Sequence, residues 1–432
     1  IYAPTLRYHD GEFYLVTTNV GGEGNFFVHT EDPAGEWSDP VWLDIGGIDP
    51  SLCFDEDGTV YLTGQGKGEF GEGGIAQAEL DIETGKLLTP WIKIWEGTGG
   101  RHPEGPHLYH INNTYYLMIA EGGTEYGHME TIARSDSPWG PFESCPHNPI
   151  ISHRDRGRHP IQGTGHADLI EDDKGNWWLF FLAFRITGGQ YHHLGRETFL
   201  APVEWEDGWP LVNGDGTVEL EMDVNRKIAE QEIKNDFRDD FNGDELGLEW
   251  NFLRKPIDDN ISLQKRTGWL RLYGNKLNLS NPDSPVFVGK RQNDFNCRVE
   301  VKLDFEPIKA GEEAGLSVFM NENHHYEIAI SKINDNKKII VRRRIGSLQT
   351  VTADEIVEEG SVILKVKADK NKYYFSYEQN NETLLMDDGE TRYLSSEVAG
   401  GFTGVYLAMY TTGNGEETSV PADFDWFEYS SG

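Results

Sequence analysis

Two acidic residues stand where strand-like segments begin, and their type suits acid–base chemistry. Glu104 lies in RHPEGPHLYH directly before an apolar run, and Asp49 lies at the start of a similar run in IDPSLCF. A carboxyl group beside an ionised neighbour resists losing its own proton, so such a pair can supply a general acid near neutral pH. The ordinary interpretations are a solvated loop residue for Glu104 and a turn-opening Asp-Pro for Asp49.

An internal repeat favours the functional interpretation. Four segments share a polar or small start, an apolar strand of about five residues, a turn rich in Asp, Asn and Gly, and an aromatic-rich strand. They are YAPTLRYHDGEFYLVTT from Tyr2, DPSLCFDEDGTVYLTGQ from Asp49, EGPHLYHINNTYYLMIA from Glu104 and GHADLIEDDKGNWWLFFLA from Gly165. Each is followed by a variable stretch with room for two further strands. Units of four strands that recur about every 45–60 residues predict the blades of a β-propeller.

The predicted propeller explains why the acidic residues sit where they do. The first strand of each blade lines the central axis, so the residues that open these strands face one cavity. At or beside that position lie Ala3, Asp49, Glu104 and His166. We therefore expect Glu104 and Asp49 to converge on the axis.

The second half of the chain has a different pattern. Residues 222–238 are polar, lack the blade pattern and are predicted to form a linker. Beyond them, short alternating strands with polar turns, such as CRVEVKLDF and YEIAISKI, predict an antiparallel β-sandwich. The predicted fold class is therefore all-β, with a propeller over residues 1–221 and a sandwich over residues 239–432.

The composition narrows the class of ligand. Lys and Arg number 38 and Asp and Glu number 73, which gives a net charge of −35. Such a field repels phosphate backbones and anionic lipid, so we expect neither nucleic-acid nor membrane binding. No apolar run approaches the roughly 18 residues that a membrane-spanning helix needs. A soluble protein with a neutral ligand is expected.

The cysteines and histidines show no metal-binding pattern. Cys53, Cys145 and Cys297 are scattered without CxxC spacing, as expected of buried free thiols in a reducing compartment, and a cytoplasmic location is predicted. No HExxH motif occurs, so a catalytic zinc site is not expected. The histidines weighed for such a site are His102, His107, His110, His128, His192 and His193.

The chain resembles the family-43 glycoside hydrolases of the two-domain β-xylosidase and α-L-arabinofuranosidase type. The matching stretches, in family order, are IYAPTLRYHDG, GIDPSLCFDEDG, EGPHLYHINNTYYLMIAEGGT, TIARSDSPWGPFE, GHADLIED, LGRETFLAPVEWEDGWP, GGFTGVYLAMY and ADFDWFEY. The resemblance implies a five-bladed propeller followed by a β-sandwich. It also implies inverting hydrolysis of xylosyl or arabinofuranosyl units from short β-1,4-xylo-oligosaccharides or hemicellulose side chains. The implied partner is a small oligosaccharide, and no cofactor is required.

Matched residue by residue, the resemblance assigns roles to the candidate site. Glu104 resembles the general acid and Asp49 the carboxylate that tunes the pKa of that acid. Arg196 in LGRETFL resembles the sugar-binding arginine, with a surface salt bridge to Glu197 as the alternative. His166 in GHADL resembles the axial histidine, which faces the pocket directly or through a cation, for which calcium or sodium is expected.

Four further side chains are expected at the sugar pocket. Thr124 in EGGT and Phe402 in GGFTG match pocket-lining positions, and Phe402 is expected to reach from the sandwich to close the propeller site. The rings of Tyr2 and Phe26 could cover the apolar faces of a sugar, although core packing explains Phe26 equally well.

One departure from the family pattern concerns the general base. Relatives carry this Asp in an Asp-Pro motif of the first blade, whereas position 3 here is Ala and four repeats are found. The chain also begins with Ile1 rather than Met. We therefore expect a first blade supplied by an N-terminal segment, by a separate chain or by a homo-oligomer partner, and impaired activity of residues 1–432 alone. The alternative functions are a non-catalytic carbohydrate-binding propeller and a protein-interaction scaffold.

Overall fold

The computed structural model describes residues 1–67, 73–222, 236–255 and 258–432. The chain divides into a first unit, Ile1–Phe184 with Glu197–Arg226, and a second unit, Arg185–Arg196 with Lys227–Gly432. Nearly all regular structure in the described residues is strand, with one α-helical turn, α1 (Ser396–Ala399). The all-β prediction is therefore confirmed. Residues 223–235 of the predicted linker lie outside the described residues.

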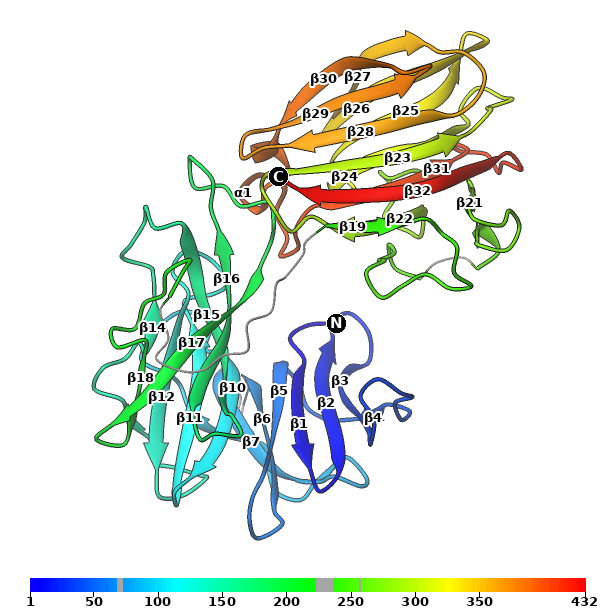
Figure 1. Ribbon diagram of the computed structural model, residues 1–432. Helices are drawn as coiled ribbons and strands as arrows, with labels where there is room; N and C mark the ends of the chain where they lie inside the picture. Colours follow the sequence, from blue (N-terminus) through cyan, green and yellow to red (C-terminus); the bar gives the residue numbers. More distant parts are fainter. Residues whose placement is uncertain (68–72, 223–235, 256–257) are drawn as a thin grey trace. The chain divides into compact units, whose positions relative to one another are not determined.

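The first unit contains four antiparallel sheets in chain order, each a meander that starts from its first strand (Figure 1). These sheets correspond to the four repeats and are the predicted blades. The first holds β1 (Thr5–His9), β2 (Glu12–Asn19), β3 (Gly24–Thr30) and β4 (Val41–Trp42). The second holds β5 (Ile48–Phe54), β6 (Val60–Lys67), β7 (Gly73–Asp81), β8 (Lys86–Leu87) and β9 (Ile92–Trp95). The third holds β10 (Glu104–Ile111), β11 (Thr114–Glu121), β12 (Met129–Ser135), β13 (Glu143–Ser144) and β14 (Ile151–Ser152). The fourth holds β15 (Ile161–Glu171), β16 (Trp177–Arg185), β17 (Glu197–Glu206) and β18 (Trp209–Val212).

The predicted hairpin after Glu104 is present as β10 and β11. Its two-residue loop is Asn112-Asn113, with φ of 50° and 62°. Both residues adopt the left-handed conformation that a type I′ hairpin loop needs, and Asn tolerates it better than most residues. The loop therefore fixes the register that pairs Ile111 with Thr114.

Neighbouring blades bury apolar side chains against each other, while the two end blades expose some on their outer faces. The buried clusters centre on Phe27 and Leu62, on Ile75 and Leu117, and on Met118 and Leu179. On β1, Leu6 and Tyr8 are 48% and 64% exposed. Phe180 and Leu200 pair across β16 and β17 and are 39% and 36% exposed. Because strand residues alternate between faces, one face of each end blade joins a core and the other carries these side chains.

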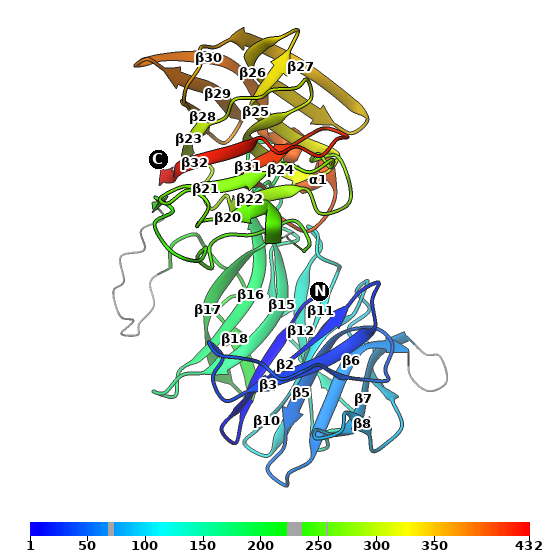
Figure 2. The ribbon, with the colours of Figure 1, turned by 90° about the vertical axis from the view of Figure 1, so that its right-hand side faces the viewer.

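The second unit is a sandwich of two antiparallel sheets, seen in Figure 2 as two stacked layers. One sheet has the order β20-β21-β32-β23-β28-β29-β30, with β19 also paired to β32. The other has the order β22-β31-β24-β25-β26-β27. Their bounds are β19 (Phe237–Asp239), β20 (Ile261–Ser262), β21 (Leu270–Tyr273), β22 (Val286–Arg291), β23 (Cys297–Asp304), β24 (Glu313–Asn321), β25 (His324–Ile333), β26 (Asn336–Ile345), β27 (Leu348–Ile356), β28 (Val362–Ala368), β29 (Lys372–Gln379), β30 (Glu382–Glu390), β31 (Tyr406–Thr412) and β32 (Pro421–Ser431).

Alternation builds the core of this sandwich. Along β23, Val299, Val301 and Leu303 are fully buried while the residues between them are less buried. The same period of two places one side of each sheet in a single large apolar cluster. The sandwich predicted from the alternating pattern is therefore confirmed.

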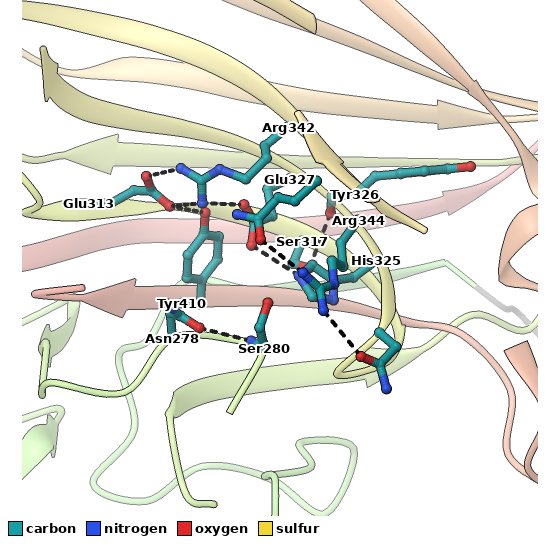
Figure 3. A network of polar contacts seen from close by, with 12 residues as sticks. Asn278, Ser280, Glu313, Ser317, His325, Tyr326, Glu327, Arg342, Arg344 and Tyr410 are labelled. Atoms are coloured by element: carbon teal, nitrogen blue, oxygen red, sulfur yellow. Dashed lines mark hydrogen bonds and ion pairs between the residues drawn. The ribbon is translucent and has the colours of Figure 1, made fainter. Parts of the chain in front are cut away.

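A buried ionic network lies on β24, β25, β26 and β31 (Figure 3). Arg342 donates to both oxygens of Glu313, at 2.9 and 2.5 Å, and to Oε2 of Glu327 at 2.7 Å. The Tyr410 hydroxyl donates to Glu313 Oε1 at 2.8 Å, and His325 Nε2 lies 3.5 Å from Glu327 Oε1. Burial, together with the charge of Glu313, outweighs the attraction of Arg342 and raises the pKa of Glu327 to about 7.

The three cysteines are free and buried, as the sequence predicted. Burial raises the pKa of the Cys53 and Cys297 thiols to about 12 in each case, so both remain protonated at neutral pH. Among the described residues, no helix is both long and apolar enough to cross a membrane.

Candidate active site

The first strands of three blades carry the same irregularity at the same place. Asp49 on β5, Gly105 on β10 and His166 on β15 occupy equivalent repeat positions, with φ of 55°, 56° and 51°. The ladders of the second and third blades shift register there, between Ile48 and Ser51 and between Glu104 and His107. Left-handed Asp and His inside a strand are strained, and such strain persists mainly at functional positions. The repeat therefore marks one end of the inner strands as a candidate site.

Direct contacts join these three strands. The Gly105 N–H donates to Asp49 Oδ2 at 3.3 Å. A Cβ atom at Gly105 would lie 2.7 Å from His166 Nε2, so the glycine lets the imidazole lie against the backbone. Asp49 is buried at 5% exposure, and Glu104, which precedes the glycine, is half-buried. These contacts place the backbone segments that carry Asp49, Glu104 and His166 next to one another.

A buried carboxylic acid contacts the backbone of β15 next to His166. The Ala167 N–H, next to His166, donates to Glu130 Oε2 at 3.1 Å. Burial raises the pKa of Glu130 well above its ordinary value, although the backbone donors oppose the shift. The neighbouring His128 lies against the same strand, with Nδ1 3.0 Å from the Gly163 carbonyl. Glu130 was not predicted as a site residue, because no local sequence motif surrounds it.

A second polar cluster on the inner strands was also not predicted from the sequence, because its members lie far apart along the chain. Arg7 Nη1 lies 2.6 Å from Asp168 Oδ2, and Arg7 Nη2 lies 2.8 Å from His107 Nδ1. The Tyr109 hydroxyl donates to Asp168 Oδ1 at 2.6 Å. Burial lowers the pKa of His107 to about 3, so the ring is neutral at neutral pH. Burial would raise the pKa of Asp168, but His107 and Arg7 outweigh it and lower that pKa to about 2. This cluster ties β1, β10 and β15 together.

The predicted pocket residues of the first unit lie in different settings. Tyr2 is 44% exposed, and its backbone N–H donates to the Thr18 carbonyl at 2.9 Å. Phe26 lies on β3 with its ring centroid 4.9 Å from that of Trp42. This ring contact supports the alternative in which Phe26 packs against other side chains. Thr124 follows the end of β11 and is half-buried.

The two predicted sugar-binding residues of the second unit touch each other. The Arg196 guanidinium carbon lies 5.0 Å from the centroid of the Phe402 ring. Arg196 Nε donates to the Phe402 carbonyl at 3.3 Å. Phe402 itself is 53% exposed. The planar donor group of Arg196 and the aromatic ring of Phe402 therefore lie side by side.

Metal ligands are not grouped in the part of the chain that the structure describes. No set of three or more His, Cys, Asp or Glu side chains there could hold a metal ion. A cation beside His166 stays a prediction, and no step of the reaction is derived through one.

Comparison with known families places this geometry in context. Residues 1–210 match the model of the glycosyl hydrolases family 43, and residues 238–430 match the β-xylosidase C-terminal concanavalin A-like domain. The chain belongs to glycosyl hydrolase family 43. The predicted family and the assignment as a glycosidase are thus confirmed.

Characterised relatives agree with this membership over nearly the whole chain. A non-reducing end α-L-arabinofuranosidase of Bacteroides ovatus is 42% identical, over 99% of this chain and 81% of the relative. A xylosidase/arabinosidase of Butyrivibrio fibrisolvens is 37% identical, over 99% of this chain and 85% of the relative. The solved structure of a family-43 protein from the Bacteroides ovatus xyloglucan locus is similar with a TM-score of 0.94 at 41% identity, covering 100% of this chain and 85% of that one.

Proposed function

We propose that this glycosidase removes xylosyl or arabinofuranosyl units, with inversion, from short β-1,4-xylo-oligosaccharides or hemicellulose side chains. The observation that carries the proposal is the left-handed backbone position repeated on three inner strands, beside which Asp49, Glu104 and His166 lie. The relatives named above, an arabinofuranosidase and a xylosidase/arabinosidase, support both sugars as candidates.

Glu104 is the general acid in this proposal. Protonating the leaving oxygen requires a carboxyl group that keeps its proton near neutral pH, although free Glu titrates near ~4.3. Asp49 sits on the adjacent inner strand, where Gly105 N–H donates to its carboxylate. An ionised Asp49 raises the pKa of Glu104 by repulsion, because a second negative charge nearby is unfavourable.

Arg196 and Phe402 bind the sugar in this proposal. The guanidinium offers rigid, planar donors to hydroxyl groups, and the ring offers a face for the apolar side of a pyranose or furanose. Their contact at 5.0 Å and the 53% exposure of Phe402 support a shared binding role.

A fifth blade supplies the general base. The exposed Leu6 and Tyr8 on the first blade and the exposed Phe180 and Leu200 on the fourth support this part of the proposal, because another sheet would bury them. An inverting enzyme needs a base whose carboxyl group lies about 6.5–9.5 Å from that of the acid, with room for the attacking water, and loss of the base typically costs about 10²–10⁴-fold in rate. We expect hydrolysis of xylosides to require a further sheet that covers these exposed side chains and carries the base.

The deciding experiment measures product and stereochemistry together. Aryl β-xyloside and aryl α-arabinofuranoside are incubated with a form of the enzyme that includes this further sheet, and the first-formed anomer is read by NMR. Release of sugar with inverted configuration supports the proposal, and the ratio of kcat/KM values identifies the preferred sugar. Calorimetric binding of xylose without any release would instead favour a carbohydrate-binding protein.

A further inference from the structure

The segment Arg185–Arg196 connects β16 to β17 of the fourth blade in sequence but belongs to the second unit. Its backbone bonds to the end of that unit which bears α1. The Ser396 N–H donates to the His192 carbonyl at 3.0 Å, and the Val405 N–H donates to the His193 carbonyl at 2.9 Å. The connection is therefore held on both sides of the loop that carries Phe402.

Two glycines bring the backbones into contact. A Cβ atom at Gly195 would lie 2.4 Å from Gly404 N, and one at Gly404 would lie 2.1 Å from the Leu194 carbonyl oxygen. Gly195 also has φ of 75°, which disfavours other residues. The segment and the 400–405 loop therefore meet without intervening side chains, so a shift in one moves the other.

Arg291, at the end of β22, donates hydrogen bonds to two carbonyl groups of the segment. Its Nη2 donates to the Leu194 oxygen at 2.7 Å and to the Arg196 oxygen at 2.7 Å, and its Nε donates to the Leu194 oxygen at 3.2 Å. The guanidinium fork thus spans the backbone on both sides of Gly195. A lysine has one point-like ammonium group and lacks this planar geometry.

A carboxylate provides a second attachment. Glu397 in α1 accepts from the His192 N–H at 2.9 Å, and its other oxygen lies 2.6 Å from His192 Nδ1. These contacts fix the segment at His192, two residues before Leu194, the first residue whose carbonyl Arg291 holds. The neighbouring His193 ring is fully buried and packs edge-on against Phe295 at 5.3 Å.

The residue at the end of this clasp is Arg196. Its side chain emerges directly after the carbonyls held by Arg291 and lies on Phe402, whose own loop meets the same segment. The clasp, defined as Arg291 and Glu397 with the backbone of 192–196, therefore determines where the guanidinium and the ring lie.

We propose that Arg291 is a positioning residue for substrate binding, acting through Arg196 without touching the sugar. The inference rests on the proposed function, in which Arg196 contacts the sugar. Groups that bind substrate must be held closely, and a displacement of about 1 Å can cost on the order of 100-fold.

The test compares Arg291→Lys with Arg298→Lys, a conservative change at an exposed arginine of the same unit, in the form of the enzyme that turns over. We expect Arg291→Lys to raise KM for an aryl glycoside about 10- to 100-fold, with kcat within about twofold and both pH limbs unmoved. Arg298→Lys should leave both constants unchanged. An unchanged KM in Arg291→Lys overturns the proposal. So does a fall in kcat of about 10- to 100-fold with KM unchanged.

A double-variant cycle separates this inference from the proposed function. If Arg291 acts through Arg196, the double variant Arg196→Lys with Arg291→Lys should be no worse than Arg196→Lys alone. Additive effects would overturn the positioning role. A normal KM in Arg196→Lys would instead contradict the proposed sugar-binding role of Arg196 itself.

A second variant covers the case in which Arg291→Lys fails to fold. Glu397→Gln keeps the size of the side chain and an acceptor for the His192 N–H, but removes its charge. We expect a smaller rise in KM, about 3- to 10-fold, that also disappears in the Arg196→Lys background. A rise that persists in that background would contradict positioning through Arg196.

Discussion

Buried carboxylates occur in both units, but they are held in opposite ways. In the sandwich, Glu327 and Arg342 face each other directly across β25 and β26, and that ladder runs through them without interruption. In the propeller, Asp49 lies where the ladder breaks, has a left-handed backbone and accepts from a backbone N–H. Burial of a charge is therefore no sign of chemistry by itself. A left-handed backbone position repeated across blades distinguishes the candidate active site from a structural ion pair.

The largest expected effect follows from removing the proposed acid. Glu104→Gln should lower kcat about 10²–10⁴-fold on a xyloside with a poor leaving group, because the leaving oxygen then departs unprotonated. An activated aryl xyloside should lose much less. The measurement uses the form of the enzyme that turns over, and Glu96→Gln, a change at an exposed ion-paired residue, is the control. Equal losses on both substrates would contradict the assignment.

Substitutions in the ionic network of the sandwich should change the free energy of unfolding and leave the activity unchanged. Arg342→Met leaves Glu313 and Glu327 buried without their cation, and we expect a loss of about 3–5 kcal/mol in the free energy of unfolding. Denaturant titration measures it. Adding Glu313→Leu and Glu327→Leu should restore most of the loss, since a fully apolar replacement leaves no unpaired charge. A loss below about 1 kcal/mol would show that the network is not desolvated as described.

The raised pKa of Glu327, about 7, gives the sandwich a pH dependence. Between its unfolded pKa, near ~4.3, and this value, the folded protein holds a proton that the unfolded chain has released. Stability is therefore fully present below the unfolded pKa and falls as pH rises toward 7, by about 1–3 kcal/mol. Glu327→Gln should flatten that fall in urea titrations at pH 4.5 to 7.5. An unchanged slope would assign the pH dependence to other groups.

The propeller pair should show its coupling in a pH–rate profile. Asp49→Asn removes a negative neighbour and so lowers the pKa of Glu104. The alkaline limb of the kcat/KM profile should then move toward lower pH. Asp57→Asn, in the exposed turn after β5, should leave the limb in place. A limb that does not move in Asp49→Asn means that the two carboxylates are not coupled.

The smallest effect concerns the sandwich residue that we place in the binding role. Phe402→Ala should raise KM about 2- to 10-fold through loss of an aromatic face for the sugar. Because the side chain is 53% exposed, the melting temperature should barely change. A lowered melting temperature with unchanged KM would show that Phe402 stabilises the sandwich and does not bind the sugar.

Local patterns were enough to predict much of the fold. The Asn112-Asn113 loop and the alternation along β23 depend on residues close in sequence, and both were predicted from the sequence. The repeat also predicted that residues at or beside one repeat position, Asp49, Glu104 and His166 among them, face the same axis.

Tertiary structure alone decided the rest, because it concerns pairings that no local pattern encodes. Arg7 and Asp168 meet across 161 residues, and Glu130 supports the strand of His166 without any motif around it. The segment Arg185–Arg196 connects two propeller strands, yet bonds to Arg291 and Glu397 of the sandwich. Sequence determined which residues could form strands, turns and acid–base groups through short-range propensity. Which of them touch was set by how the sheets pack, since each such contact depends on the position of a whole element.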